Sequence, residues 1–457
     1  MNRKRVIGIA VAVIGCAGIA LAGTLLSEKK AVVILDAEET VIGKISYEEE
    51  QVVYDCDEAY RSYVDIVWKE AVEAVTEKER AKEETIKKEM VREEWVIRTR
   101  CNQELCEQIQ QIYNGNQDVD GKDFAVAVSD TKGHMIASYS NSRTIQNRNL
   151  VTEHTYAGST MKPLSVYGPA IADDTIHWSS LFLDDAYMQI TDKDGKVVGW
   201  PTNTEPYSKK LITVEEALAK SNNAVAVRVL KDVGAERICE FLKEEMSMEL
   251  DVEIEKLKRE GEDSVLSNLA LGYLQNGISV QQMLENYQVF ANGGKRYPLH
   301  TIVSVEDQNG KVFFRENEDE KRVFDEATAY VVNRLLKKVV EEGTGIQAKI
   351  DEIDVCGKTG TSERYQDNWF IGMTPEYVCA VWYSDEEFLH ESNEAVPVFK
   401  EIIQNLNCDE EVSYTIPEEV TEEAYCLETG LVANKSCQRT KMGYYKRSNM
   451  PEVCDCK

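Results

Sequence analysis

The chain has 457 residues and a formal net charge of −29, with 52 basic against 81 acidic side chains. An apolar content of 43% with 8% aromatic residues is typical of a folded protein and excludes a mainly disordered chain. Because a nucleic-acid binder needs a basic surface, this acidic excess argues against nucleic acid as a partner.

The first predicted element is a membrane-spanning helix at residues 6–26. This run of 21 uncharged residues would extend about 30 Å as a helix, which is the thickness of a bilayer hydrocarbon core. Arg3, Lys4 and Arg5 precede it, and by the positive-inside rule they predict that residues 1–5 are cytoplasmic. The expected location is therefore the cell membrane, with a single span and an extracytoplasmic remainder.

Two other interpretations of this segment stay open. A cleaved secretory signal would use a small-residue site such as Ala20 and Ala22. A lipid anchor would use Cys16, although the apolar run continues past that cysteine for ten residues. Each of these alternatives also exports the rest of the chain.

Residues 27–122 are predicted to form a mostly helical stalk, with a short strand at 31–35. From residue 57 to residue 113 there is no proline or glycine. Apolar side chains recur there at the three- and four-residue spacing of one helix face: Tyr60, Val64, Val67, Ala71 and Val75. Residues 77–88 are almost wholly polar, so a solvated spacer is favoured over a coiled coil that binds a partner.

From residue 123 the pattern becomes that of a mixed domain, which is expected to extend to residue 405. Strands are predicted at 124–128, 134–139, 354–362, 368–373 and 377–384, and helices at 214–220 and 280–290. The last three strands are short alternating runs separated by turn residues, which indicates an antiparallel meander. Strands at both ends with helices between them predict an α+β sheet built from sequence-distant segments.

Three short motifs carry the predicted chemistry, and their fixed order makes them specific. They are Ser159-Thr160-Met161-Lys162, Ser221-Asn222-Asn223 and Lys358-Thr359-Gly360-Thr361. A serine one helical turn before a lysine, followed by Ser-x-Asn and by a Lys-Thr-Gly strand, suits a serine acyl-transfer site that needs no histidine. Ser159 is the predicted nucleophile. Lys162 is the predicted base, provided that burial and neighbouring cations lower its pKa.

The stretch from residue 123 to residue 384 resembles the transpeptidase domain of penicillin-binding proteins, and the bifunctional class A type most closely. Beyond the motifs, the matching phrases lie at residues 158–163, 199–203, 215–229, 291–294, 342–345 and 367–372. The resemblance implies the fold of the serine β-lactamases and penicillin-binding transpeptidases, an antiparallel sheet flanked by helices. No cofactor is implied, and the five histidines show no metal-binding spacing.

The resemblance also implies a role for the second motif. In this family its serine, here Ser221, relays a proton to the leaving amine, and its asparagine, here Asn223, binds the substrate amide and the lysine. The same two residue types are good helix caps, so they would also suit the start of a helix at Ala224. Capping and catalysis are compatible.

The third motif is expected on an edge strand that borders the cleft. The resemblance implies that Lys358 supplies positive charge, that Thr359 and Thr361 offer hydroxyls to a substrate carboxylate, and that Gly360 leaves room beside the strand. By the same analogy, the oxyanion hole consists of the backbone N–H groups of Ser159 and Thr361.

The function implied is that of a membrane-anchored D,D-transpeptidase, which cross-links peptidoglycan stem peptides through a serine acyl-enzyme that β-lactams would trap. Residues 27–122 are too few for the glycosyltransferase domain of class A proteins and lack its glutamate motif, so a separate glycosyltransferase or cell-wall complex is the expected partner. Two alternatives stay open. One is a D,D-carboxypeptidase or weak β-lactamase with the same site, and the other is a catalytically weak penicillin-binding scaffold.

Residues 406–457 form a predicted C-terminal tail with four cysteines: Cys426, Cys437, Cys454 and Cys456. Outside the cell such a cluster favours disulfides over a zinc site, and no metal site is predicted. The tail resembles a cysteine-bearing extension of some class A proteins. Two further cysteines, Cys356 and Cys379, lie in strand-like runs and are expected to be buried thiols.

Overall fold

The structure is a computed structural model that describes residues 29–145, 148–317, 319–362, 366–384, 393–406, 408 and 412–457. The predicted membrane helix, and the two alternatives for it, lie outside these described residues. Within them, no helix combines the length and the apolar character that crossing a bilayer requires.

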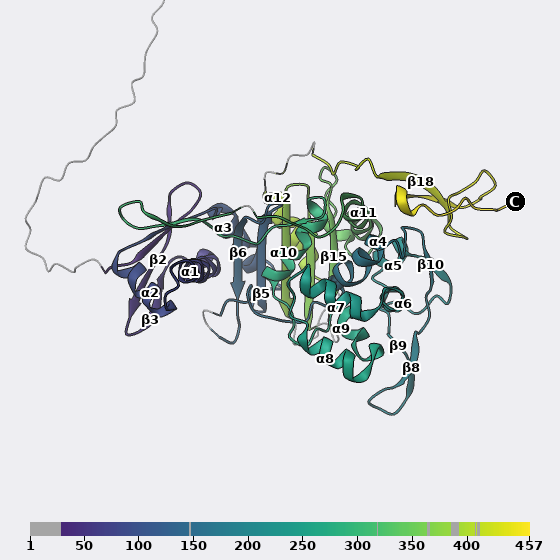
Figure 1. Ribbon diagram of the computed structural model, residues 1–457, viewed down its shortest axis with the longest axis horizontal. Helices are drawn as coiled ribbons and strands as arrows, with labels where there is room; N and C mark the ends of the chain where they lie inside the picture. The colour runs from purple at the N-terminus through teal and green to yellow at the C-terminus, as the bar shows by residue number, and fades with distance from the viewer. Residues whose placement is uncertain are drawn as a thin grey trace, which may run out of the picture.

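A five-stranded antiparallel sheet forms the centre of the molecule (Figure 1). Its order is β15 (Cys356–Thr361), β16 (Asp367–Met373), β17 (Tyr377–Ser384), β5 (Asp123–Asp130) and β6 (Met135–Asn141). The predicted strands and the meander are confirmed, and β5 pairs with β17 over its whole length although some 250 residues separate them in sequence. This pairing leaves β15, which carries the third motif, at one edge of the sheet.

Helices cover both faces of this sheet. On one face, α12 (Ala395–Asn405) packs against β16 and β17, with the ring centroids of Phe370 and Phe399 4.8 Å apart. On the other face, α10 (Val280–Ala291) packs against β17 and β5, while α11 (Glu326–Glu342) lies along β15. The helices predicted at 214–220 and 280–290 are confirmed as α5 (Val214–Ala219) and α10. Cys356 and Cys379 are buried free thiols, as expected.

A group of short elements continues from β15 on the right of Figure 1. Its helices are α4 (Gly168–Ala172), α5, α6 (Asn223–Val233), α7 (Ala235–Glu244), α8 (Asp251–Glu260) and α9 (Leu266–Leu271). Its short strands are β7 (Leu181–Leu183), β8 (Met188–Thr191), β9 (Val197–Trp200) and β10 (Leu211–Thr213), and two further strands, β11 (Lys295–Arg296) and β14 (Lys321–Arg322), pair with each other after α10.

Residues 29–122 form a sheet-and-helix unit, so the prediction of a solvated helical stalk is wrong. The predicted strand at 31–35 is confirmed as β1 (Val32–Leu35), but β2 (Val41–Glu48), β3 (Gln51–Asp55) and β4 (Val96–Thr99) join it in one sheet. This sheet, which is shown at the left of Figure 1, also takes in β12 (Ile302–Glu306) and β13 (Val312–Arg315) from the middle of the chain. The unit is therefore completed by residues far outside the predicted stalk.

The apolar helix face predicted in this region faces a core rather than solvent. It belongs to α1 (Glu58–Glu79), on which Tyr63, Val64 and Val67 are fully buried. The polar stretch at 77–88 is explained by a turn: α1 ends at Arg80 in a left-handed conformation, and α2 (Glu83–Arg92) begins three residues later. Polar side chains thus mark a surface corner between two packed helices.

This N-terminal unit is joined to the central sheet by buried hydrogen bonds. The hydroxyl of Tyr63 donates to the carbonyl of Met135 at 2.9 Å, and Ser62 donates to Asn149 at 2.9 Å. Helix α3 (Gln103–Gly115) then packs on β6 and α12 and leads into β5. The unit consequently supports the sheet edge opposite β15.

The tail forms a hairpin of β18 (Val420–Cys426) and β19 (Thr440–Lys446), which lies over the right-hand side of the molecule (Figure 1). The hydroxyl of Tyr445 donates to Ser179 at 2.8 Å, and Asn449 donates to the carbonyl of Ile176 at 2.9 Å. The tail is thus packed against the residues that precede β7.

Candidate active site

Ser159 lies at the start of a helical segment that packs against the edge strand β15. The segment begins as a short 3₁₀ helix, Gly158–Met161, and continues through Pro163–Tyr167 into α4. Two glycines allow the close approach. A Cβ on Gly158 would lie 2.8 Å from the carbonyl oxygen of Thr361, and a Cβ on Gly360 would lie 2.6 Å from that of Ala157. The room that Gly360 leaves is therefore filled by the segment that bears Ser159.

The amine of Lys162 is buried and surrounded by acceptors. It donates to the backbone carbonyl of Ser221 at 2.6 Å, to Oδ1 of Asn223 at 2.6 Å and to the hydroxyl of Ser221 at 3.3 Å. Burial, together with the positive charge of Lys358, lowers the pKa of Lys162 well below its usual value. This is the condition that the sequence analysis set for a lysine that removes a proton from Ser159.

The second buried amine is that of Lys358 on β15, and it contacts the same serine hydroxyl as the amine of Lys162. It donates to the hydroxyl of Ser221 at 2.9 Å and to the carbonyl of Thr359 at 3.0 Å. Burial lowers the pKa of Lys358 to about 7. The hydroxyl of Ser221 thus lies between two buried amines, and the pKa of each is lowered.

Ser221 owes this position to the end of helix α5. Its backbone is left-handed with φ 56°, its N–H donates to Leu218, and the N–H of Asn222 donates to Ala217. These two bonds form a Schellman motif, in which glycine is the usual left-handed residue. A serine is sterically less favourable than a glycine in this left-handed conformation. The presence of a serine here therefore points to a role for its side chain.

Of the two asparagines in the second motif, one caps a helix and the other contacts Lys162. Asn222 caps α6, since its Oδ1 accepts from the N–H of Val225 at 2.9 Å, and its amide donates to Asp184 at 2.8 Å. Asn223 is the residue that touches Lys162, and its own N–H donates to Asn203 at 2.8 Å. The cap expected in this motif is therefore Asn222, and Asn223 is free to face the site.

Asp184 and Asn203 position the second motif, and neither was predicted to have a role. Oδ1 of Asp184 accepts from both Asn203 and Asn222, at 2.9 and 2.8 Å. Asn203 lies within the family-like phrase at residues 199–203, which is the signal that the sequence offers for it. Asp184 had none, because nothing local marks a carboxylate that serves residues 19 and 38 positions later.

The hydroxyl of Thr359 is already engaged within the protein. It lies 2.6 Å from the hydroxyl of Thr344, whose backbone N–H donates to Ala219 at the end of α5. Thr344 therefore connects the second and third motifs. It lies in the family-like phrase at residues 342–345, but no role was predicted for it. Thr361 is half-exposed at the end of β15, beside the equally half-exposed Ser159.

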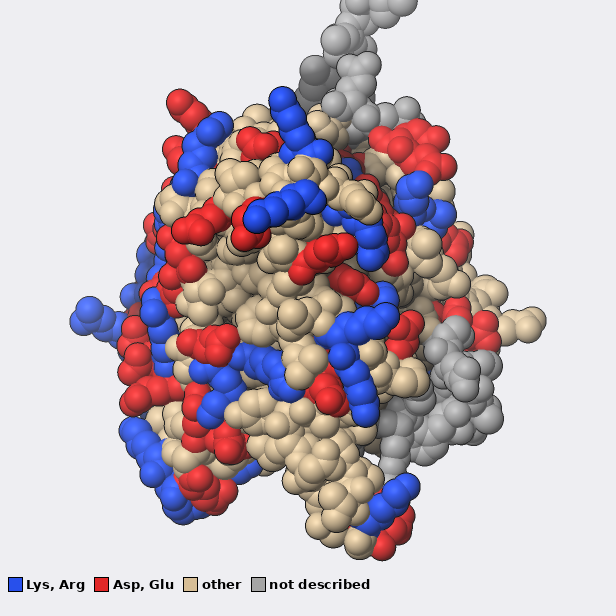
Figure 2. All heavy atoms as spheres, turned by 90° about the vertical axis from the view of Figure 1, so that its right-hand side faces the viewer, with Lys and Arg blue, Asp and Glu red and all other residues tan. Residues whose placement is uncertain are grey.

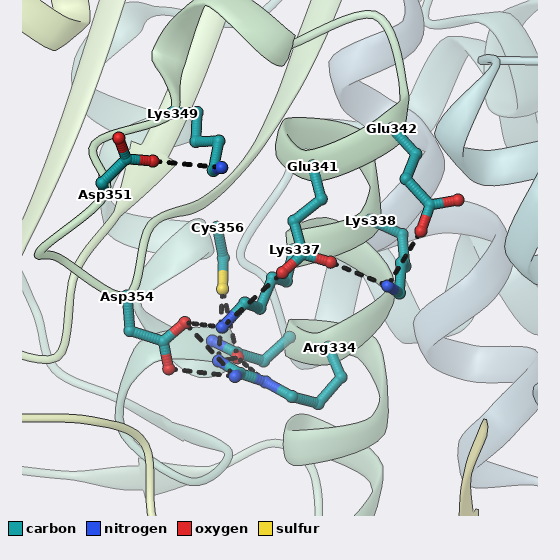
Figure 3. A network of polar contacts seen from close by, with 10 residues as sticks. Arg334, Lys337, Lys338, Glu341, Glu342, Lys349, Asp351, Asp354 and Cys356 are labelled. Atoms are coloured by element: carbon teal, nitrogen blue, oxygen red, sulfur yellow. Dashed lines mark hydrogen bonds and ion pairs between the residues drawn. The ribbon is translucent and has the colours of Figure 1, made fainter. Parts of the chain in front are cut away.

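The start of β15 is anchored by a separate ionic cluster, shown in Figure 3. Arg334 of α11 donates to both carboxylate oxygens of Asp354, at 3.3 and 2.9 Å, and to the sulfur of Cys356 at 3.3 Å. Lys337 adds a 2.7 Å contact to the same carboxylate. Burial raises the pKa of Asp354, but the charges of Arg334 and Lys337 outweigh it, and the pKa is lowered overall. Asp354 therefore stays ionised and holds the strand to α11.

The structure thus brings together Lys162, Ser221, Asn223, Lys358 and Thr359 in one chain of contacts, with Ser159 one helical turn before Lys162. Ser221 lies beside both buried amines, and amines with lowered pKa values near serine hydroxyls are what serine acyl-transfer chemistry requires. The family model for the penicillin binding protein transpeptidase domain matches residues 123–404. The chain belongs to this family.

Curated relatives agree with this assignment. Penicillin-binding protein 4 of Bacillus subtilis is 30% identical over 252 residues, which are 54% of this chain and 38% of that protein. Penicillin-binding protein 1A of Clostridium tetani is 30% identical over 328 residues, which are 65% of this chain and 39% of that protein. This chain matches less than half the length of either relative.

Solved structures show the same fold. The D,D-transpeptidase domain of a peptidoglycan glycosyltransferase from Eggerthella lenta aligns with a TM-score of 0.62 at 19% identity, covering 82% of this chain and 98% of that one. Penicillin-Binding Protein 1A from Haemophilus influenzae aligns with a TM-score of 0.60 at 19% identity, covering 73% and 54%. The first alignment covers more of the chain than residues 123–404, so the shared fold extends beyond the matched domain.

Proposed function

We propose that this protein is a D,D-transpeptidase that cross-links peptidoglycan stem peptides through an acyl-enzyme on Ser159. The observation that carries the proposal is the environment of Lys162. Its amine is fully buried, has two acceptors at 2.6 Å and has a lowered pKa. A neutral amine can use its two N–H groups for these acceptors, which leaves its lone pair for the proton of Ser159.

In the proposed first step, the Oγ of Ser159 forms a bond to the carbonyl carbon of a D-Ala-D-Ala peptide bond, and its proton passes to Lys162. The C–N bond then breaks, and D-alanine leaves with a proton delivered by Ser221, which receives in its place the proton that Lys162 took from Ser159. The contacts of Ser221 with both amines, at 3.3 and 2.9 Å, support this relay. Backbone N–H groups of Ser159 and Thr361 would stabilise the oxyanion, typically by about 3 kcal/mol per donor.

In the proposed second step, the amine nitrogen of a neighbouring stem peptide forms a bond to the acyl carbon, the ester bond to Ser159 breaks, and a proton of the amine returns to the Oγ of Ser159. Before D-alanine leaves in the first step, the positive charge of Lys358, with the hydroxyl of Thr361, would bind the terminal carboxylate of the first stem peptide. A β-lactam would acylate the same serine. The bond between Thr359 and Thr344 favours Thr361 as the freer hydroxyl for this contact.

The proposal includes an anchor at residues 6–26 and a glycosyltransferase supplied by another chain. The second point is supported by the fold of residues 29–122, which form the N-terminal sheet with β12 and β13.

The face shown in Figure 2, which includes the tail, carries acidic and basic side chains interspersed, a pattern that does not suit a polyanionic partner.

Labelling with a fluorescent penicillin tests the proposal. Wild-type protein is expected to label, and Ser159→Ala is expected not to label although it folds. Unlabelled wild-type protein would contradict every reading in which Ser159 is an active nucleophile.

A second experiment separates transpeptidation from hydrolysis. The release of D-alanine from a stem-peptide mimic is measured with and without an acceptor amine. The proposal predicts a cross-linked product when the amine is present. Release of D-alanine with water as the sole acceptor would instead identify a carboxypeptidase.

A further inference from the structure

The four cysteines of the tail converge on one point. Cys426 ends β18, Cys437 lies in the loop that leads to β19, and Cys454 and Cys456 follow β19. All four sulfur atoms lie within 4.8 Å of one another. The sulfur of Cys456 lies 3.9 Å from that of Cys426 and 3.1 Å from that of Cys454. Tail cysteines separated by up to 30 residues in sequence thus share a single site.

This spacing suits a tetrahedral ion. A Zn–S distance of about 2.3 Å places the sulfurs of a four-cysteine site about 3.8 Å apart. The cysteines are free thiols in the structure. An all-sulfur donor set selects a soft or borderline metal such as Zn²⁺ over Mg²⁺ or Ca²⁺, which prefer oxygen. We propose that Cys426, Cys437, Cys454 and Cys456 bind one structural zinc ion, in place of the disulfides that the sequence favours.

Hydrogen bonds to the sulfurs are an independent feature that points to a metal. The N–H of Asn434 donates to the sulfur of Cys437 at 3.3 Å, and the hydroxyl of Thr429 donates to that of Cys454 at 3.2 Å. Four thiolates around Zn²⁺ carry a net charge of −2, and donors of this kind disperse it. Donors aimed at sulfur have no such purpose at a disulfide.

The backbone between the ligands is also ordered around the site. The N–H of Cys454 donates to Val432 at 2.7 Å, and the amide of Asn434 donates to the carbonyls of Cys454 and Cys456, at 2.6 and 2.9 Å. Gly430 has φ +70°, and a Cβ there would lie 2.4 Å from the carbonyl oxygen of Ser179. The loop that presents Cys426 and Cys437 is therefore pressed against the main domain.

The proposed ion would secure the tail to helix α5, which ends just before Ser221. Tyr425, next to Cys426, donates to the buried carboxylate of Glu215 at 3.1 Å, and Ser179 donates to the carbonyl of Gly430 at 2.5 Å. Glu215 lies in α5, whose end presents Ser221 to the two lysines. The metal is thus structural, and the site stands whether or not the proposed transpeptidase activity is correct.

Metal analysis of the full-length chain, purified without chelators, tests the inference. Wild-type protein is expected to contain about one zinc per chain, and Cys437→Ser is expected to lose most of it. The matched control is Cys56→Ser, which replaces a half-buried thiol outside the cluster and is expected to keep the zinc. Zinc retained in Cys437→Ser, or absent from the wild type, would overturn the proposal.

Two measurements on the wild-type chain keep the inference testable if Cys437→Ser does not fold. Exchange of the metal for Co²⁺ is expected to produce sulfur-to-cobalt charge-transfer absorption, and a chelator is expected to lower the melting temperature. Mass mapping of the tail is expected to recover its four cysteines as thiols. Disulfide-linked peptides among them would contradict the zinc site.

Discussion

Two clusters of cations lie along strand β15, one beside its start and one beside its middle, and they differ in how their charge is compensated. At the start of the strand, Arg334 and Lys337 face the carboxylate of Asp354. Further along, Lys162 and Lys358 face each other, and among the described residues their hydrogen bonds go to hydroxyl, amide and carbonyl oxygens rather than to a carboxylate.

The difference separates a structural cluster from one whose amines suit the proposed chemistry. Burial lowers the pKa of Arg334, but Cys356 and Asp354 raise it above its usual value overall, so that side chain stays charged. The two lysines lack this compensation, and burial lowers the pKa of each. The pKa of a buried amine is thus lowered, and the amine can act as a base, where no carboxylate lies beside it.

The largest expected effect comes from removing the base. Lys162→Ala should lower the rate of acylation by penicillin by about 10²–10⁴-fold, the usual contribution of a general base. The rate is measured by stopped-flow or timed labelling. Lys337→Ala, which removes a lysine from the other cluster, should leave the rate within a few fold. A similar loss in both variants would contradict the separation of roles.

The next effect is on stability. Asp354→Asn should lower the free energy of unfolding by about 3–5 kcal/mol, because it leaves buried Arg334 without its anionic partner. Asp351→Asn is the matched control, since that carboxylate is 80% exposed and pairs with Lys349 at 3.1 Å. This pair, also shown in Figure 3, should contribute less than about 1 kcal/mol. Urea unfolding of both variants measures the difference, and equal losses would refute it.

A carboxylate introduced beside Lys162 should make the Lys162–Lys358 cluster resemble the cluster around Asp354, in which the cations stay charged. Acylation requires a neutral lysine, so its rate should rise with pH through the lowered lysine pKa. Asn223→Asp places an anionic oxygen where Oδ1 now lies, 2.6 Å from the amine of Lys162. It should raise that pKa by about 1–3 units and move the acidic limb of the pH–rate profile to higher pH.

The control for this shift is Asn223→Ala, which removes the same contact without adding charge. Its acidic limb should not move to higher pH, although its rate is expected to fall. If both variants move the limb upward alike, the pKa of Lys162 is not set by the missing carboxylate.

The smallest expected effect concerns Thr344, which links the two motifs through Thr359. Thr344→Val should cost about 0.5–1.5 kcal/mol of stability by removing one hydrogen bond. Acylation should slow only a few fold, because the contacts of Ser221 with both lysines remain. A loss comparable to that of Lys162→Ala would place Thr344 within the catalytic machinery.

The site could be predicted because its motifs are local. Ser159 and Lys162 lie one helical turn apart, and Lys358 and Thr359 are adjacent. Their spacing was therefore enough to single them out as candidate site residues. The strands of the central sheet were predicted for the same reason, from short alternating runs. What spacing could not predict was which side chains hold these motifs, such as Asp184, which acts on residues far along the chain.

The N-terminal unit was predicted wrongly because its sheet depends on distant pairing. Strand β4 pairs on its second side with β12, which comes about 200 residues later in the sequence. No local feature of either strand indicates this pairing. The apolar face of α1 was recognised, but its partner was not, so polar residues at the corner with α2 were taken for a solvated spacer.

The mass of the peptide that contains Ser159, measured after treatment of the intact protein with penicillin, tests the central claim most directly. The proposed mechanism predicts that this peptide gains the mass of one penicillin molecule, since the β-lactam ring opens without a leaving group, and that Lys162→Ala gains it far more slowly. An unmodified Ser159 peptide, or a penicillin adduct on another residue, would contradict the mechanism.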